Sequence, residues 1–213
     1  MSLVQNKVVL VTGASRGIGR AIATTFAKAG ANVAFTYLSS VEKGQALEQE
    51  LAAFGITAKG YRSDASSYTE SEKLVEDVLA DFGTIDILIN NTGGPPPTPA
   101  AGQDPALWLK SFNDMVLSLI AITDRVLPGM RQRKWGRIIT STTSGAIAPI
   151  KNLAISNTLR AALLAWSKTL SAEVAAEGIT VNIIMPGRVA TERLRQLDEA
   201  RAKRESTTYD EVV

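Results

Sequence analysis

The sequence contains no cysteine and no histidine among its 213 residues. Without cysteine, the chain can form neither disulfides nor thiolate metal clusters, and it has no thiol nucleophile. Without histidine, it has no imidazole for acid–base catalysis and no Ser-His-Asp triad. Any proton transfer must therefore use hydroxyl groups, carboxylates, lysine, tyrosine or water.

The chain also carries little net charge and lacks long apolar runs. The formal net charge is only +2, which does not point to nucleic acid. No apolar run is long enough to span a bilayer, and residues 1–7 lack the pattern of a signal peptide. We therefore expect a cytoplasmic protein that binds neither nucleic acid nor membrane. The length and the 45% hydrophobic content predict a single domain over residues 1–213.

Glycine is concentrated where the first apolar run ends. The run Val8–Val11 is typical of a buried strand, and a helical pattern begins at about Ile18. Between them, Gly13 allows a tight turn, Gly17 lets the backbone approach a phosphate, and Gly19 lets the helix pack closely on the strand. The N-terminus of the helix would then bind a pyrophosphate. The pattern predicts a dinucleotide site, although a strand–helix turn without a ligand can show the same glycines.

Strand-like and helix-like patterns alternate along the chain. Six short apolar runs are typical of strands, at residues 8–11, 33–37, 58–62, 85–89, 137–140 and 180–184. Helical patterns lie between and after them, at residues 21–29, 42–54, 71–82, 107–132, 157–176 and 191–213. This alternation predicts an α/β fold, a Rossmann-like doubly wound parallel sheet with helices on both faces. Pro128 is expected to disturb the last turns of its helix.

The string Thr12-Gly13-Ala14-Ser15-Arg16-Gly17-Ile18-Gly19 resembles the cofactor loop of the short-chain dehydrogenase/reductase family. Within that family, the chain resembles bacterial 3-oxoacyl-acyl-carrier-protein reductases, and later motifs extend the resemblance over nearly the whole chain. The resemblance implies an NAD(P)-dependent oxidoreductase that reduces a carbonyl, either on a small molecule or on an acyl-carrier-linked substrate. It also implies that the cofactor contacts Gly13, Ser15, Arg16, Gly17, Ile18 and Gly19.

Two segments on the first half of the predicted sheet resemble further cofactor motifs. Residues 87–93 resemble the family's Asn-Asn-Ala-Gly motif, with Asn90 and Gly93 in place and Thr92 where alanine is usual. Asp64 resembles the acid that contacts adenine. Each segment has a structural alternative, because Asn90 can cap a strand end, and Asp64 and its neighbours can cap a turn or a helix.

A third segment follows the last predicted strand. Residues 186–191 resemble the family's Pro-Gly motif, which implies that this segment holds the nicotinamide carboxamide. The matching residues are Pro186, Gly187, Val189 and Thr191. A strand-to-loop turn without a ligand is the alternative interpretation.

The end of the second predicted strand indicates which cofactor binds. NAD-dependent enzymes place a carboxylate there to accept a hydrogen bond from the ribose 2′-hydroxyl. In this chain, residues 37–40 contain no acid, and Glu42 is the first one to follow. Arg16 could pair with a 2′-phosphate, or it could simply be solvated. We therefore expect NADP(H), with NAD(H) the less favoured cofactor.

The catalytic positions depart from the family pattern. Typical members use a serine and a tyrosine thirteen residues apart, followed by a lysine four residues after the tyrosine. Residues 136–140 set the register, which places Thr143, Ser156 and Arg160 at these three positions. A serine hydroxyl is far less acidic than a phenol. Two hypotheses follow: a working reductase with altered acid catalysis, or a nucleotide-binding protein that has lost redox chemistry.

Other roles remain open for the residues near these positions. Arg160 could donate to the ribose hydroxyls, and Ser156 could be only a helix N-cap. The register places Met115 where the family has a proton-relay asparagine, with Asn113 two residues earlier. Tyr209 lies in the segment that usually forms the substrate lid, so it could act in place of the missing tyrosine.

Assembly and docking can also be predicted from the long helices and the basic clusters. The helices at 107–132 and 157–176 are apolar on more than one face, which favours a homodimer or homotetramer, although burial in one large core would give the same pattern. The cations at 131–137 could dock an acidic acyl-carrier protein or only complement a helix C-terminus. Family members usually continue into a seventh strand, so either the sequence is incomplete or the sheet ends at strand six.

Overall fold

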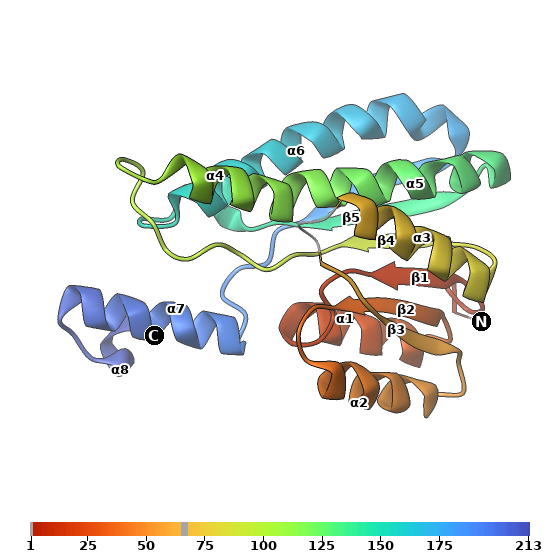
Figure 1. Ribbon diagram of the computed structural model, residues 1–213, viewed down its shortest axis with the longest axis horizontal. Coiled ribbons are helices and arrows are strands. Elements are labelled where there is room, and N and C mark those ends of the chain that lie inside the picture. Colours follow the sequence, from red (N-terminus) through yellow and green to blue (C-terminus); the bar gives the residue numbers. More distant parts are fainter. Residues whose placement is uncertain (1, 65–67) are drawn as a thin grey trace.

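Six parallel strands form one sheet in the computed structural model, which describes residues 2–64 and 68–213. The strands are β1 (Val8–Val11), β2 (Asn32–Tyr37), β3 (Ala58–Arg62), β4 (Ile87–Asn90), β5 (Gly136–Ser141) and β6 (Ile179–Ile184). Their order across the sheet is β3-β2-β1-β4-β5-β6, and each described pair is parallel. The predicted Rossmann-like doubly wound sheet is confirmed (Figure 1).

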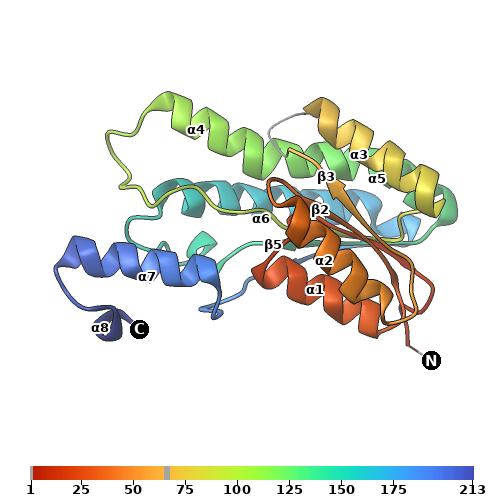
Figure 2. The same ribbon diagram turned by 60° about the horizontal axis from the view of Figure 1, so that its bottom comes forward.

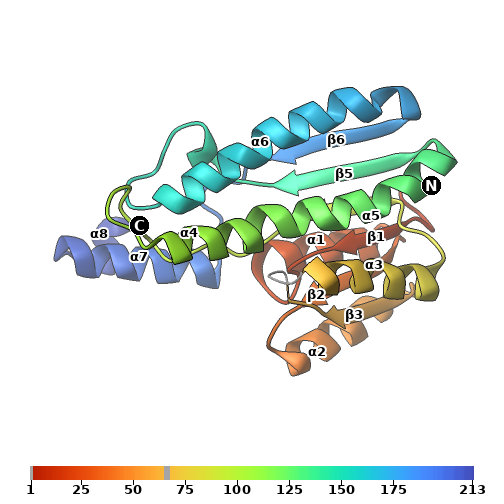
Figure 3. The same cartoon turned by 45° about the horizontal axis from the view of Figure 1, so that its top comes forward.

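Helices cover both faces of this sheet. They are α1 (Gly17–Lys28), α2 (Val41–Ala52), α3 (Tyr68–Phe82), α4 (Pro105–Phe112), α5 (Ser118–Arg133), α6 (Ala154–Val174), α7 (Glu192–Glu205) and α8 (Tyr209–Val212). Helices α1 and α2 lie on one face, while α3, α5 and α6 lie on the other (Figures 1 and 3). Helices α7 and α8 lie beyond the carboxyl ends of the strands, away from the body of the sheet (Figure 2).

Apolar side chains pack on both faces of the central strand β1. Val9 and Val11 contact the layer beneath α1 and α2, whereas Leu10 contacts the layer beneath α3 and α5. Successive side chains of a strand point to opposite faces, so a strand covered on both sides needs apolar residues throughout. All four residues of Val8–Val11 are buried. The core therefore fixes the position of β1 and of the loop that follows it.

The helical region on the α3 face is one continuous run. Helix α4 passes through a π-helical turn, Asn113–Leu117, directly into α5. The prediction that Pro128 would disturb the last turns is wrong, because α5 continues to Arg133. Leu127 and Met130 are buried on either side of the proline, and their packing offsets the missing backbone hydrogen bond.

This continuous run also corrects the expectation that no segment could span a bilayer. By length and composition, Pro105–Arg133 is the one helix among the described residues that could cross a membrane, with 29 residues and a mean hydropathy of 1.3. Core helices of globular proteins pass the same test. In this structure, 44% of the apolar window is buried against the rest of the protein.

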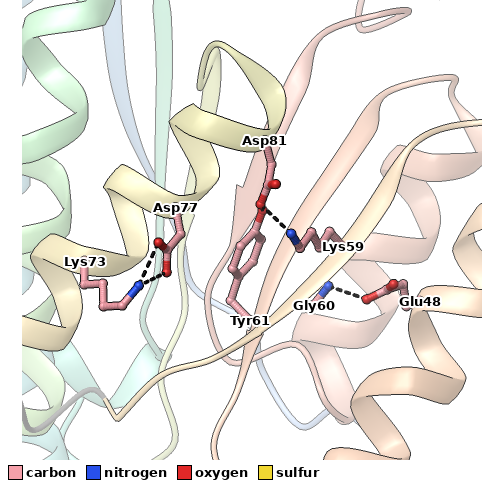
Figure 4. A network of polar contacts seen from close by, with 7 residues as sticks. All are labelled: Glu48, Lys59, Gly60, Tyr61, Lys73, Asp77 and Asp81. Carbon is pink, nitrogen blue, oxygen red and sulfur yellow. Dashed lines mark hydrogen bonds and ion pairs between the residues drawn. The ribbon is translucent and has the colours of Figure 1, made fainter.

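Strand β3 lies at one edge of the sheet, and side chains from two neighbouring helices form hydrogen bonds with it. The Gly60 N–H donates to Oε2 of Glu48 on α2 at 2.7 Å. On the other face, the Tyr61 hydroxyl and Lys59 Nζ donate to the same Asp81 oxygen on α3, at 2.6 and 2.7 Å (Figure 4). An edge strand whose N–H groups are free can pair with another chain. The Glu48 contact removes one such group from this edge.

Candidate cofactor and active site

The glycine loop joins β1 to α1 at the carboxyl edge of the sheet. Gly13 and Gly17 adopt positive φ angles of 61° and 56°, a region that favours glycine. A Cβ on Gly19 would collide with the Gly13 carbonyl oxygen, so α1 packs against the loop too closely for a side chain. No side chain of the described residues caps α1 at Arg16. The first N–H groups of α1 can therefore bind an anion.

Asn91 and two threonines hold this loop in shape. Asn91 Nδ2 donates to the carbonyl oxygens of Thr12 and Gly13, both at 3.1 Å. Thr12 Oγ1 donates to the Asn91 carbonyl at 2.7 Å, and Thr36 Oγ1 accepts from the Gly13 N–H at 2.8 Å. The sequence predictions missed these residues. The Asn-Asn motif was the available signal, but the prediction used Asn90 rather than Asn91.

Asn90, Gly93 and Asp64 lie at the ends of strands, as predicted. Asn90 is buried, its Nδ2 donates to Thr123 of α5 at 3.0 Å, and its Oδ1 has no hydrogen-bond partner among the described residues. Gly93 is exposed beyond β4. Asp64 is half-buried beyond β3, and its N–H donates to Glu70 at 2.6 Å. The other residues of the predicted capping segment, 65–67, lie outside the described part of the chain.

The segment after β6 meets the glycine loop across a pocket of about 820 Å³. The predicted cofactor residues that line it are Ser15, Arg16, Gly17, Ile18, Pro186, Val189 and Thr191. A Cβ on Gly17 would lie 3.5 Å from Thr191 Cγ2, so the two segments are neighbours. The pocket also extends along α1 to Phe26. The fold thus brings two motifs from opposite ends of the sequence to one site.

Two of these predicted contacts already have partners within the chain. Thr191 Oγ1 accepts from the Leu194 N–H at 3.2 Å and caps the N-terminus of α7. Arg16 Nη1 lies 3.2 Å from Glu192 Oε2, and both side chains are about half exposed. Gly187 lies between them and β6, in an exposed turn. A bound cofactor would therefore compete for Arg16 and for the Thr191 hydroxyl.

The catalytic candidates Thr143 and Ser156 lie where the turn Ser144–Ala146 packs against α6. Both are half-buried, and Thr143 Oγ1 accepts a long hydrogen bond of 3.4 Å from the Gly145 N–H. The alternative that Ser156 caps the helix is wrong, because it lies inside α6 and the cap is Leu153. The helix begins at Ala154, before the predicted start at residue 157, and the Ala154 N–H donates to the Thr98 carbonyl at 3.2 Å.

Arg160 is buried and bound to backbone carbonyls. Its Nη1 donates to Ser141 at 3.0 Å, and its Nη2 donates to Gly93 at 3.1 Å and to Thr92 at 3.4 Å. Burial, and then the charge of Arg193, lower the pKa of Arg160 to about 10. The guanidinium is therefore still cationic at neutral pH. It joins α6 to the ends of β4 and β5, and the predicted contact with ribose stays a prediction.

The residue at the position predicted for a proton relay is apolar. Met115 is buried in the π-helical turn and packs with Ile155 and Leu159 of α6. Asn113 is half-buried two residues earlier in the same π-helical turn, and Tyr209 is exposed at the start of α8. The thioether of methionine cannot donate a hydrogen bond, so Met115 cannot order a water chain as an amide would.

Arg193 is a further residue of this site that the sequence predictions missed. It lies in the first turn of α7, and its Nη2 donates to the Pro95 carbonyl at 2.6 Å. Burial, and then the charge of Arg16, lower the pKa of Arg193. The only sequence signal was the basic cluster at 188–204, which does not show which arginine faces the site.

The other basic cluster, 131–137, lies at the opposite edge of the sheet, where β5 begins. Arg131 pairs with Glu177 at 2.7 Å, and Arg133 donates to the Ile85 carbonyl at 2.8 Å. Arg137 donates to the Gly136 and Gly178 carbonyls at 2.7 and 3.1 Å. These contacts favour the structural interpretation of the cluster over carrier docking, because the cations join elements far from the glycine loop.

Comparison with known proteins identifies the family. The model of the family described as short chain dehydrogenase matches residues 7–202. The chain is 36% identical over 201 residues to the 3-oxoacyl-acyl-carrier-protein reductase FabG of Escherichia coli, covering 93% of this chain and 80% of that protein. It is 35% identical over 194 residues to the acetoacetyl-CoA reductase of Shinella zoogloeoides, covering 91% and 78%.

Solved structures agree with this assignment. The L-sorbose reductase of Gluconobacter frateurii, solved with NADPH and L-sorbose, has a TM-score of 0.90 at 30% identity, over 99% of this chain and 80% of that one. An NAD⁺-bound xylitol dehydrogenase has a TM-score of 0.89 at 27% identity, over 94% and 78%. The chain therefore belongs to the short-chain dehydrogenase family of NAD(P)-dependent oxidoreductases.

Proposed function

We propose that this chain uses NADPH to reduce a carbonyl group on a small or acyl-carrier-linked substrate of the 3-oxoacyl type. The observation that carries the proposal is the pocket in which the glycine loop faces residues 186–191. The names of the relatives, 3-oxoacyl-acyl-carrier-protein reductase and acetoacetyl-CoA reductase, support the substrate class. A bound nicotinamide would supply the hydride, and the chain must bind it, orient the carbonyl and provide the proton.

The charge around the glycine loop supports NADP(H) over NAD(H). Arg16, Arg20 and Lys43 all line the pocket, and the end of β2 at residues 37–40 carries no acid. A carboxylate at that strand end would repel a 2′-phosphate, whereas these cations attract one. The solved relative with NADPH points the same way, although the NAD⁺-bound xylitol dehydrogenase shows that the fold accepts either cofactor.

Calorimetric titration with NADPH and NADH tests this preference. The parent protein should bind NADPH more tightly, and Arg16→Glu should remove the preference. A charge-assisted hydrogen bond to phosphate is worth about 1.5–3 kcal/mol. Lys134→Glu, at the opposite edge of the sheet, makes the same change of charge and should leave both affinities unchanged. Tighter binding of NADH by the parent protein would contradict the proposal.

The proton must come from a group other than the missing phenol. Thr143 and Ser156 hydroxyls can donate hydrogen bonds to the carbonyl oxygen, and water can supply the proton. Arg160 stays charged and holds the strand ends instead of giving up a proton. We therefore propose Thr143, Ser156 and Arg160 as binding and orienting groups of a reductase with weak acid catalysis.

A second candidate function is nucleotide binding without redox turnover. The buried Met115 at the relay position favours it, together with serine and arginine at the other two positions. NADPH consumption with a panel of carbonyl compounds separates the two functions. Binding of NADPH without consumption on any of them would favour the second candidate.

A further inference from the structure

The loop between β5 and α6 joins the two hydroxyl groups that the proposed function assigns to the carbonyl. Thr143 lies at the start of this loop, directly before the turn Ser144–Ala146, and Ser156 lies after its end, in the first turn of α6. The shape of the loop therefore sets where Thr143 lies relative to α6. Ile147 and Ile150 within the loop are 68% and 43% exposed, so burial of these two side chains does not fix that shape.

Asn157 contacts this loop from inside α6. Its side chain is 9% exposed, and its Nδ2 donates to the Ile150 carbonyl at 2.8 Å. A Cβ on Gly145 would lie 2.5 Å from Asn157 Oδ1 and 3.2 Å from Ile150 Cδ1, so Gly145 packs closely against both residues. The Gly145 N–H in turn donates to Thr143 Oγ1 at 3.4 Å. One buried amide therefore contacts both the turn after Thr143 and the loop that follows this turn.

Other contacts hold the end of the loop rather than the turn. The Thr98 N–H donates to the Asn152 carbonyl at 2.8 Å, and the Ala154 N–H donates to the Thr98 carbonyl at 3.2 Å. Within the described part of the chain, no α6 side chain other than that of Asn157 forms a hydrogen bond with residues 144–151. Loss of this contact should therefore loosen the turn and leave the end of the loop in place.

We propose that Asn157 is a positioning residue that holds the Thr143 hydroxyl in place for the carbonyl. This inference rests on the proposed function and adds a residue that acts through its neighbours, without contact with the substrate. A buried polar group that loses its hydrogen-bond partner is unfavourable, so the contact with the Ile150 carbonyl resists opening. Glycine permits this arrangement, because any Cβ at position 145 would overlap the Asn157 amide.

Asn157→Asp tests the hydrogen bond without changing the size of the side chain. An ionised carboxylate cannot donate to the Ile150 carbonyl. We expect keto-ester turnover to fall about 10- to 100-fold, as for a group displaced from its working position, while the NADPH affinity measured by calorimetry stays unchanged. Thr169→Ala is the matched control on α6, because Thr169 is exposed and bonds to the Ala165 carbonyl within its own helix. The control should change neither quantity.

The contact with Gly145 gives a second test. Gly145→Ala places a Cβ against Asn157 Oδ1 and should lower turnover by a similar factor. Asn157→Ala removes that oxygen, so the variant with both alanines should lose less turnover than the product of the two single losses. Losses that simply multiply would show that the two residues act independently, and they would contradict the inference.

Hydrogen exchange of residues 144–150 separates this inference from the proposed function, because it requires no turnover. Exchange should be faster in Asn157→Asp than in the parent protein or in Thr169→Ala. Unchanged exchange, or a loss of turnover matched by an equal loss of NADPH affinity, would overturn the inference. If the parent protein consumes no NADPH with any carbonyl compound, the proposed function fails, whereas faster exchange would still support Asn157 as the residue that holds the turn. Should Asn157→Asp fold poorly, Asn157→Ala removes the donor without adding a charge.

Discussion

In the proposed reaction, the residues at three positions decide how the site can move a proton. Thr143 and Ser156 offer weakly acidic hydroxyls, and Arg160 offers a charge that is held by three backbone carbonyls. A reductase of this fold must protonate the oxygen that receives the hydride, and no described residue at these positions is an effective acid at neutral pH. The proposed reaction should therefore be limited by protonation.

The double variant Ser156→Tyr with Arg160→Lys should raise keto-ester turnover. A positioned general acid contributes about 10²–10⁴-fold in rate, and a lysine beside the phenol lowers the pKa of the phenol. NADPH consumption at saturating cofactor measures the effect. The matched control is Ser156→Phe with Arg160→Lys, which adds the ring without its hydroxyl and should show no gain.

The opposite result would identify another proton donor. If the parent protein reduces a keto ester at an ordinary rate and the tyrosine variant slows it, the proton does not come from position 156. Water near Arg160, or Tyr209 of α8, would then be the next candidate.

Some residues of this site could be predicted from the sequence, and others could not. The glycines of the loop were predictable because each has a local backbone reason, and the Pro-Gly segment was predicted from its resemblance to a family motif. Arg193 was not, because its partner Pro95 lies 98 residues away in the sequence and is reached only after folding. Asn91 was missed for a related reason: two adjacent asparagines look alike in sequence, but the strand end points them in different directions.

At the scale of single elements, short apolar runs between helical patterns predicted every strand of the described sheet. Errors arose at ends and irregularities: the strand predicted at 85–89 is Ile87–Asn90, and the π-helical turn Asn113–Leu117 has no signature in the periodicity. Nor could periodicity predict which contacts hold an edge strand. In β3, these contacts come from ionisable side chains of neighbouring helices.

The attachment of β3 to α3 should give the protein a pH-dependent stability. Hydrogen bonds from Lys59 and then Tyr61 lower the pKa of Asp81 below its ordinary value. Because the folded-state pKa is the lower one, this stabilisation is complete above the unfolded-state pKa of about 3.9 and is lost as pH falls through the folded value. Asp81→Asn should therefore be less stable than the parent at pH 7, and the difference should shrink toward pH 3.

Urea unfolding at pH 7, 5 and 3 measures that difference. Asp77→Asn is the control on the same helix, since the ion pair that Asp77 makes among the described residues is with exposed Lys73 (Figure 4). This substitution should cost little stability at any of the three pH values. If the difference in the free energy of unfolding between the parent and Asp81→Asn stays constant down to pH 3, the ionised carboxylate is not the stabilising form.

At the scale of the whole molecule, part of the apolar surface of the run Pro105–Arg133 stays exposed in the described structure. Leu109 is 63% exposed and Leu117 is 43% exposed, while Trp108 and Phe112 are only half-buried beside them. The alternative of burial in one large core does not hold for these two leucines. Exposed large apolar side chains on this run favour association with another copy.

Light scattering at micromolar concentration should therefore show a homodimer or homotetramer. Leu109→Asp should shift the measured mass toward the monomer, because it places a charge in the patch. Leu79→Asp is the control, since Leu79 is also exposed but lies on α3. A parent protein that is monomeric under these conditions would rule out the predicted assembly.

Because Arg16 is already paired with Glu192, binding of a 2′-phosphate by Arg16 would replace one ion pair with another. Arg16 must release Glu192 to bind the phosphate, so one pair replaces another and few additional small ions are displaced. The affinity for NADPH would then decrease less steeply with added salt than it would if Arg16 were unpaired before the phosphate bound. Glu192 is released at the N-terminus of α7, where the helix dipole still favours its charge. Because Arg193 follows Glu192 in the same turn and donates to the Pro95 carbonyl, release of Glu192 acts on a helix turn that also contacts the loop after β4.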